Sequence, residues 1–226
     1  AEEFQPRLVL VGRSPLPADE EAAETAQLES PAEIKAVLIQ ELKAANGKAS
    51  PAEVETRYRR LMGDREIRQA LARIRAAGAE VEYHSVDVRD AKALKSLVAD
   101  VTARHGAIHG VIHGAGVIED KLVKDKTPES FDRVFGTKVE SAYTLSECLD
   151  PKTLKFFVLF SSLASRYGNR GQSDYAAANE VLSKLAIQLD REWPARVVAI
   201  AWGPWSGLGM VADLEPHLRR RGLKLI

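Results

Sequence analysis

Polar side chains at one predicted strand–helix junction could carry out proton transfer. The apolar run FVLF at 157–160 ends at Ser161 and Ser162, and an Ala-rich helical pattern after a short Gly-rich loop carries Tyr175 and Asn179. Because Tyr175 and Asn179 are four residues apart, a helix presents both on one face. A buried strand followed by a loop and a helix is typical of α/β folds, in which ligands bind at the carboxyl ends of the strands. The pattern therefore favours a hydroxyl and a phenol that face each other across a reaction site.

Each of these residues also has a structural interpretation. Ser162 could cap the end of a strand, Tyr175 could be a half-buried aromatic residue, and Asn179 could lie on the surface. Polar groups at the ends of elements usually bond to the backbone, so residue type alone is weak support for catalysis. The prediction depends on their joint spacing.

The rest of the chain supplies the elements of a parallel sheet. Strands are predicted at 7–13, 80–87, 109–115, 154–162 and 196–203, and helices at 65–77, 91–105, 128–149 and 172–191. Strands that are separated by helices of about ten or more residues indicate βαβ units, and right-handed crossovers would put helices on both faces. The predicted fold is of the α/β class, a Rossmann-like doubly wound parallel sheet.

Residues 15–64 differ from this alternation. Their first part, PLPADEEAAETAQLESP, is acidic and rich in Ala and Pro, which indicates a solvated linker. A Ser-Pro pair at 30–31 and another at 50–51 each open a predicted helix, and Gly47 and Gly63 end them. We interpret the segment as an inserted helical hairpin. The first helix has an apolar face, which we expect to pack against protein rather than bind a cofactor: Ile34, Val37, Leu38 and Leu42.

Composition narrows the classes of function. The 226 residues are 45% hydrophobic, enough for the core of one large domain. Lys+Arg and Asp+Glu both number 32, and this zero net charge argues against a nucleic-acid-binding protein. Cys148 is the single cysteine, so no internal disulfide can form and a reducing compartment is expected. With no signal peptide, no apolar run of about 18 residues and no metal-ligand spacing among the histidines, we expect a cytoplasmic protein without membrane or metal binding.

The Ser–Tyr stretch resembles the short-chain dehydrogenase/reductase superfamily. Within it, the chain is similar to the ketoreductase domains of modular polyketide synthases and polyunsaturated-fatty-acid synthases. Most members of the superfamily place Lys four residues after the Tyr, where this chain has Asn179. Polyketide-type ketoreductases exchange the two positions and take the Lys from the preceding long helix, which Lys138 in FGTKVESAYTLSE matches; Lys184 is the alternative cation. The resemblance implies a catalytic set of Lys138, Ser162, Tyr175 and Asn179.

The cofactor expectations combine strand ends with this resemblance. The strand at 7–13 ends in Gly12-Arg13-Ser14 and offers no carboxylate for the ribose of NAD, whereas an Arg at this place accommodates the 2′-phosphate of NADP. We therefore expect NADPH, although Arg13 could also be a solvated loop residue. By resemblance, the remaining cofactor contacts come from the ends of later strands and from the catalytic pair: Asp87, Val88, Gly114, Ala115, Gly116, Lys138, Tyr175, Pro204 and Trp205.

Stereochemistry is predicted from two further positions. Ile118-Glu119-Asp120 resembles the Leu-Asp-Asp signature of B-type ketoreductases, and Tyr167 stands where A-type members have Trp. Both favour a D-configured 3-hydroxyacyl product, although Asp120 could instead cap a helix. Residues 206–221 would form a lid, in which Met210 and Leu214 either face the acyl chain or only pack the lid.

The resemblance extends from Arg7 to about Leu223. The family's first strand and Gly-rich phosphate loop would precede Arg7, and its final helix and strand would follow Ile226. We therefore expect residues 1–226 to be one ketoreductase domain, truncated at both ends, with 15–64 inserted.

The implied activity is reduction of a β-ketoacyl chain linked through phosphopantetheine to an acyl carrier protein, beside neighbouring synthase domains. Two other functions stay open. One is a non-catalytic structural domain of a synthase, and the other is a free-standing reductase of small ketones.

Overall fold

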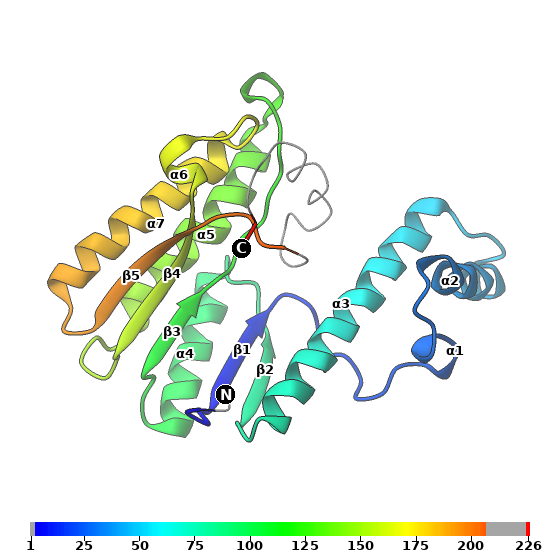
Figure 1. Ribbon diagram of the computed structural model, residues 1–226, viewed down its shortest axis with the longest axis horizontal. Helices are drawn as coiled ribbons and strands as arrows, with labels where there is room; N and C mark the ends of the chain where they lie inside the picture. Colours follow the sequence, from blue (N-terminus) through cyan, green and yellow to red (C-terminus); the bar gives the residue numbers. More distant parts are fainter. Residues whose placement is uncertain (1–2, 207–224) are drawn as a thin grey trace. The chain divides into compact units, whose positions relative to one another are not determined.

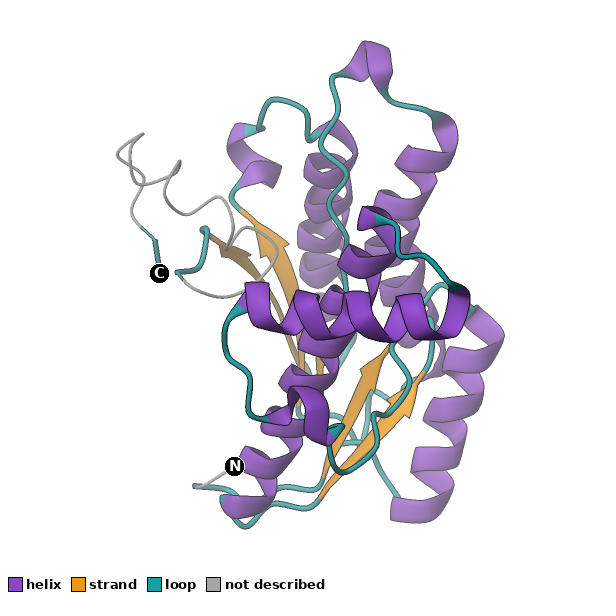
Figure 2. Cartoon of the chain, turned by 90° about the vertical axis from the view of Figure 1, so that its right-hand side faces the viewer, coloured by secondary structure: helices purple, strands orange, loops and turns teal. Residues whose placement is uncertain are grey.

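A computed structural model of the chain describes residues 3–206 and 225–226, which group into two units, Ala1–Val86 and Asp87–Ile226. The strands that pair within each unit are parallel (Figure 1), and in Figure 2 their arrows point the same way. Across the described residues, no helix combines the length and apolar character that a membrane span needs. The α/β class and the parallel strands confirm the predicted Rossmann-like fold.

The first unit contains two strands and three helices. Strand β1 (Leu8–Gly12) pairs with β2 (Val81–Ser85), and α1 (Ala23–Ala26), α2 (Pro31–Asn46) and α3 (Pro51–Ala76) lie between them in the sequence. Ile34, Leu38 and Leu42 are buried, at 0–5% exposure, and α2 packs against α3. The apolar face predicted on this helix therefore packs against protein, as expected.

The prediction that Gly63 ends a helix is wrong, because α3 continues from Pro51 to Ala76. It joins the second predicted hairpin helix to the helix predicted at 65–77. Glycine inside a helix costs only about 1 kcal/mol relative to Ala, and no proline follows to interrupt the hydrogen bonds. The capping box between Ser50 and Glu53 starts the helix and satisfies two backbone donors there.

The acidic segment before α2 is not simply a solvated linker. Thr25 is 2% exposed, and Glu21 binds the guanidinium groups of Arg65 and Arg68 at 2.8 and 3.1 Å. Arg65 also donates to the carbonyl oxygens of Thr25 and Leu28. Ionic contacts with α3 therefore fix a segment whose composition alone suggested solvation.

The second unit contains the order α4 (Ala91–His105), β3 (Gly110–His113), η1 (Val123–Asp125), α5 (Pro128–Cys148), β4 (Phe156–Ser162), α6 (Ala164–Tyr167), α7 (Ser173–Glu192) and β5 (Arg196–Trp202). Its sheet has the order β3-β4-β5, with Val111 beside Phe157 and Phe157 beside Val197. The core is formed by one face of this sheet together with α4, α5 and α7, and it includes Leu94, Ala142, Phe157, Leu182 and Val197.

The strands pair as two sheets, where the sequence predicts one. In the Rossmann strand order 3-2-1-4-5-6, the first strand lies between strands 2 and 4. The observed orders β2-β1 and β3-β4-β5 match the 3-2 and 4-5-6 parts of that order. The predicted connectivity is thus retained within each unit.

Candidate active site

The carboxyl end of β4 and the first turns of α7 form the candidate site. Alternate residues of β4, including Phe157, Leu159 and Ser161, are buried, at 0–4% exposure. Ser161 Oγ donates to the carbonyl oxygen of Asn179 at 2.9 Å and lies 3.0 Å from Ser183 Oγ, which ties the strand end to α7. Because strand side chains alternate between faces, this contact leaves Ser162 on the opposite face.

Lys138 of α5 provides the cation of this site. Its side chain is buried, its Nζ donates to the carbonyl oxygen of Phe160 at 2.9 Å, and the same Nζ lies 5.7 Å from the centroid of the Tyr175 ring. The alternative, Lys184, is 64% exposed and pairs with Glu180 at 3.3 Å. The structure thus brings Lys138, and not Lys184, to Tyr175.

Burial shifts the pKa values of both members of this pair. It lowers the pKa of Lys138 to about 8 and raises the pKa of Tyr175 above its usual value. Polar contacts of Tyr175 with Ser162 and Asn179 oppose the increase, and the negative charge of Asp120 adds to it. Near neutral pH, Tyr175 is therefore protonated and Lys138 charged, as a proton donor and its supporting cation must be.

Asn179 is fully buried beside the phenol. Its Nδ2 donates to the carbonyl oxygen of Tyr175 at 2.7 Å, four residues earlier on α7. Within the described part of the chain, Asn179 Oδ1 and Trp202 Nε1 are buried without a hydrogen-bond partner. Unpaired buried polar atoms are rare and costly, so these two suit a site that binds a further polar group.

Gly116 leaves the room that Lys138 occupies. A Cβ at this position would lie 2.9 Å from Lys138 Cε and 3.3 Å from its Nζ. The sequence predicts small residues at 114–116 for close approach of a cofactor, and the structure adds the catalytic ammonium as a neighbour. Such a bare backbone beside a cation fits a nicotinamide cofactor.

Aromatic rings surround the ends of β4 and β5. The Trp202 and Trp205 ring centroids are 5.1 Å apart, and Phe160 lies 5.5 Å from Trp202 and 6.3 Å from Trp205. The carbonyl oxygen of Pro204 accepts a hydrogen bond from the backbone of Ile226. The predicted residues Pro204 and Trp205 are therefore ordered at the strand end that follows Trp202.

Other predicted cofactor residues belong to the first unit. Gly12 ends β1, and the carbonyl oxygens of Arg13 and Ser14 accept hydrogen bonds from Ser85 Oγ and from the Tyr83 hydroxyl. The side chain of Arg13 is exposed to solvent. The contacts within this unit hold the backbone of the turn and leave the guanidinium at the surface.

Asp87 and Val88 open the second unit. The Asp87 carboxylate pairs with Arg89 at 2.6 Å, and Val88 packs against the hydrophobic core. Arg89 therefore shares the carboxylate that the sequence assigns to adenine.

The stereocontrol positions differ in their surroundings. Both carboxylate oxygens of Asp120 accept from Gln172 Nε2, at 3.1 and 3.0 Å, so the alternative that Asp120 caps a helix is wrong. The cap of α5 is instead Thr127. Tyr167 is 84% exposed on α6, and Met210 and Leu214 lie outside the described residues.

The sequence reasoning missed an ion pair next to the phenol. Lys126 Nζ lies 2.6 Å from the carboxylate of Asp174, the residue directly before Tyr175. An acidic residue in the first turn of a helix is a recognisable sequence signal for Asp174. Lys126 carries no such signal, because 48 residues separate it from its partner.

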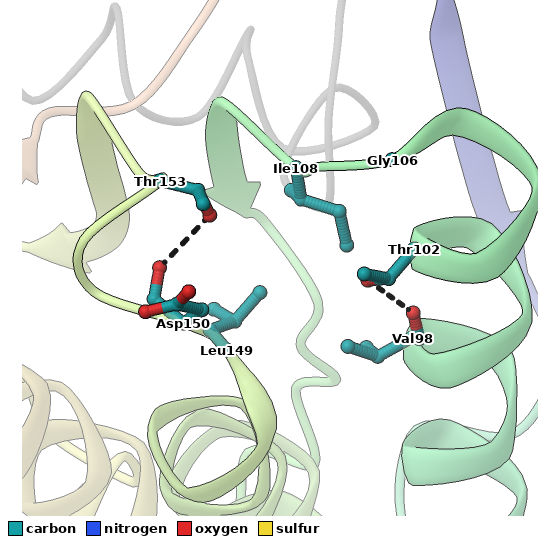
Figure 3. A pocket seen from close by; sticks show the side chains of 7 residues that line it. All are labelled: Val98, Thr102, Gly106, Ile108, Leu149, Asp150 and Thr153. Atoms are coloured by element: carbon teal, nitrogen blue, oxygen red, sulfur yellow. Dashed lines mark hydrogen bonds between the residues drawn. The ribbon is translucent and has the colours of Figure 1, made fainter.

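A small cavity lies elsewhere in the second unit (Figure 3). Its volume is about 50 Å³, and it is enclosed by the end of α4 and by the segments that lead into β3 and β4. These segments are at the amino ends of the strands, whereas Ser162 ends β4. The lining contains none of the predicted site residues: Val98, Thr102, Gly106, Ile108, Leu149, Asp150 and Thr153.

Comparisons with known sequences agree with this geometry. The family model described as KR domain matches residues 1–207. A polyunsaturated fatty acid synthase of Thraustochytrium sp. is 34% identical over 226 residues, 97% of this chain and 8% of the synthase. A phenolphthiocerol synthesis polyketide synthase type I of Mycobacterium marinum is 37% identical over 152 residues, 67% of this chain and 7% of that protein. The chain thus spans less than a tenth of the length of these relatives.

Solved ketoreductases have a similar fold. An N-terminal ketoreductase from the macrolactin assembly line has a TM-score of 0.67 and 27% identity, over 97% of this chain and 34% of that one. A ketoreductase from the first module of phoslactomycin biosynthesis in Streptomyces sp. HK803 has a TM-score of 0.65 and 39% identity, over 73% of this chain and 37% of that one. The chain therefore belongs to the KR domain family, the ketoreductases of the short-chain dehydrogenase/reductase superfamily, oxidoreductases that use a nicotinamide cofactor.

Proposed function

We propose that this domain uses NADPH to reduce a β-ketoacyl thioester on an acyl carrier protein to the 3-hydroxyacyl thioester. The observation that carries the proposal is the Lys138 ammonium 5.7 Å from the centroid of the Tyr175 ring, at the end of the strand that bears Ser162. Two relatives are a polyunsaturated fatty acid synthase and a polyketide synthase, which supports an acyl substrate held among neighbouring synthase domains.

The proton would come from Tyr175. Its hydroxyl and that of Ser162 would hydrogen-bond to the ketone oxygen, and Tyr175 would transfer its proton to the alkoxide as negative charge develops there. Lys138 would stabilise the resulting phenolate, and Asn179 would orient Lys138 or an ordered water. Positioned donors at a developing charge supply much of the rate enhancement in many enzymes, and general acid catalysis alone contributes about 10²- to 10⁴-fold.

Bound NADPH would supply the hydride that reaches the ketone carbon. Gly12, Arg13 and Ser14 would hold its 2′-phosphate end, and Lys138 with Tyr175 would bind the nicotinamide ribose. The remaining contacts would be made by Asp87, Val88, Gly114, Ala115, Gly116, Pro204 and Trp205. The unpaired buried atoms Asn179 Oδ1 and Trp202 Nε1 support a polar ligand at the nicotinamide end.

The product would have the D configuration. Asp120 is held by Gln172, three residues before Tyr175, so the signature loop contacts the segment that leads into the catalytic helix. We propose that Asp120 and Tyr167 set the face of the ketone that is presented. Met210 and Leu214 would contact the acyl chain.

The substrate and cofactor classes can be tested together. We would measure initial rates with a β-ketoacyl chain on a carrier protein and with a small free ketone, each with NADPH and with NADH, and determine the product configuration. The proposal expects NADPH, the carrier-bound substrate and the D product. Faster turnover of the free ketone would favour the free-standing reductase, and absence of NADPH binding would favour the structural domain.

Arg13 offers a separate test of the 2′-phosphate contact. Charge-assisted hydrogen bonds contribute about 1.5–3 kcal/mol, so Arg13→Gln should raise the KM for NADPH by about 10- to 100-fold and leave the KM for NADH within about twofold. Arg170→Gln, at an exposed position in the other unit, is the matched control. Equal effects on the two cofactors would remove Arg13 from the proposed site.

A further inference from the structure

The loop between β3 and α5 is fastened to the start of α7 at three points. The backbone N–H of Lys121 donates to the carbonyl oxygen of Gly171, at 3.0 Å. Gln172 Nε2 donates to the Asp120 carboxylate, and Lys126 Nζ donates to Asp174 Oδ2 at 2.6 Å. Tyr175 is the next residue after this last contact.

The third contact is a buried ion pair. The side chains of Lys126 and Asp174 are 5% and 1% exposed. Lys126 Nζ also donates to the carbonyl oxygen of Glu119 at 2.9 Å, and Asp174 Oδ1 accepts from the backbone N–H of Tyr175 at 2.8 Å. A continuous chain of polar contacts therefore runs from the loop, through Lys126 and Asp174, to the backbone of Tyr175.

The same loop is also fastened to the helix that carries Lys138. The Glu119 carboxylate accepts from Arg133 Nε at 2.7 Å and from Ser130 Oγ at 2.8 Å, and both partners belong to α5. Glu119 thus binds α5 while its carbonyl oxygen binds Lys126. One short segment connects the helices that supply the cation and the phenol.

Stability alone does not account for a pair of this kind. Removing two charges from water is so costly that a well-packed apolar pair of similar volume is often as stable or more stable. What a buried pair does provide is a defined geometry, because each charge tolerates few other positions for its partner. Here the geometry it defines is that of the first turn of α7.

We propose that Lys126 and Asp174 are positioning residues for ketone reduction. They hold the first turn of α7 against the β3–α5 loop and thereby keep the Tyr175 hydroxyl in register with Lys138. This role rests on the reductase function proposed above and assigns it two residues that touch neither substrate nor cofactor.

The test compares four variants of the pair with one matched control. Lys126→Met, Asp174→Asn, the double variant and Lys126→Arg would be measured for kcat, for the KM of NADPH and for the midpoint of thermal unfolding. The control is Lys95→Met, which removes a Lys–carboxylate pair of similar length, 2.7 Å, that is exposed and lies between α4 and α5. Amide hydrogen exchange over residues 173–179 would report the first turns of α7 independently of turnover.

The proposal predicts a separation of kcat from stability. Misplacement of a reacting group by about 1 Å can cost about 100-fold, so Lys126→Met should lower kcat by about 10- to 100-fold, with the KM for NADPH within about twofold. The double variant removes the uncompensated charge and should regain thermal stability while kcat stays low. Lys126→Arg keeps the charge and should retain most of kcat. Exchange over 173–179 should accelerate in Lys126→Met and not in Lys95→Met.

Two results would overturn the proposal. One is a double variant that regains kcat together with stability, and the other is unchanged exchange over 173–179 in Lys126→Met. Failure of the underlying function would look different, because the unmodified chain would then consume no NADPH with any β-ketoacyl thioester, whatever the variants do to exchange.

Discussion

Two ion pairs of similar chemistry lie in different settings in this chain. In the first unit, Glu21 pairs with Arg65 at 2.8 Å, with side chains 11% and 15% exposed. In the second unit, Lys126 pairs with Asp174 at 2.6 Å, with side chains 5% and 1% exposed. The first pair closes the inserted helices upon themselves, whereas the second precedes Tyr175. Location, rather than strength, therefore decides whether such a pair serves folding or chemistry.

The sharpest test of this contrast lies in the site itself. Lys138→Met should lower kcat by about 100- to 1,000-fold, because it removes the charge that supports the phenolate. Lys184→Met is the matched control, since Lys184 is a second cation of the site region and is 64% exposed. Its kcat should stay within about twofold of the parent. Steady-state NADPH oxidation measures both, and similar losses would contradict the assignment of Lys138.

In the first unit, the expected loss is in stability. Arg65→Met leaves Glu21 without its main partner and removes the hydrogen bonds to the carbonyl oxygens of Thr25 and Leu28. We expect the free energy of unfolding to fall by about 2–3 kcal/mol, somewhat less than for a fully buried pair, and kcat to stay unchanged at a temperature where the variant is folded. Denaturant unfolding gives the first quantity. Arg59→Met, which removes an exposed pair with Glu55, should change it by less than about 0.5 kcal/mol.

The pH dependence distinguishes the two regions in another way. Burial lowers the pKa of Lys138 to about 8, so its charge, and with it kcat/KM, should decline about tenfold per pH unit above pH 8. The unfolded chain binds this proton up to a higher pH, so deprotonation above pH 8 relieves the cost of burying the charge and adds to stability. Hence activity should fall while the contribution of Lys138 to stability rises. An alkaline limb of activity that follows unfolding would contradict this assignment.

Glu21 responds at the opposite end of the scale. The Arg65 guanidinium lowers the pKa of Glu21 to about 2. Its contribution to stability is therefore complete above about pH 4.5 and is lost as the pH falls towards 2. This acid-sensitive contribution should be absent in Arg65→Met, as acid unfolding curves would show.

The smallest expected effect concerns the continuity of α3. Nothing lies within 4 Å of a Cβ placed at Gly63, and this residue is inside the helix. Gly63→Ala should therefore raise the free energy of unfolding by about 0.5–1 kcal/mol and leave kcat unchanged. Destabilisation would indicate that the chain needs a break at Gly63, as the sequence suggested.

The sequence predicts the elements of the catalytic unit well. The helix expected at 91–105 is observed as α4, Ala91–His105, and the exchange of Lys and Asn is matched by the approach of Lys138 to Tyr175. These features depend on local periodicity or on motif spacing, which a single sequence contains. The roles of the individual site residues stay predictions.

Other features depend on contacts that periodicity does not encode. Gly63 looks like a helix end, yet its local cost is too small to interrupt α3. Glu21 looks solvated until Arg65, 44 residues later, is placed beside it. Lys126 and Asp174 are both ordinary surface residue types, and only tertiary packing buries them together.

Reduction through Tyr175 can be tested by NADPH consumption with a β-ketoacyl thioester, comparing the parent chain with Tyr175→Phe and with Tyr143→Phe. Tyr143 is 45% exposed on α5 and serves as the matched control. We expect turnover in the parent and in Tyr143→Phe, and a loss of about 100- to 10,000-fold in Tyr175→Phe. Turnover that survives in Tyr175→Phe would contradict the assignment of Tyr175 as the proton donor.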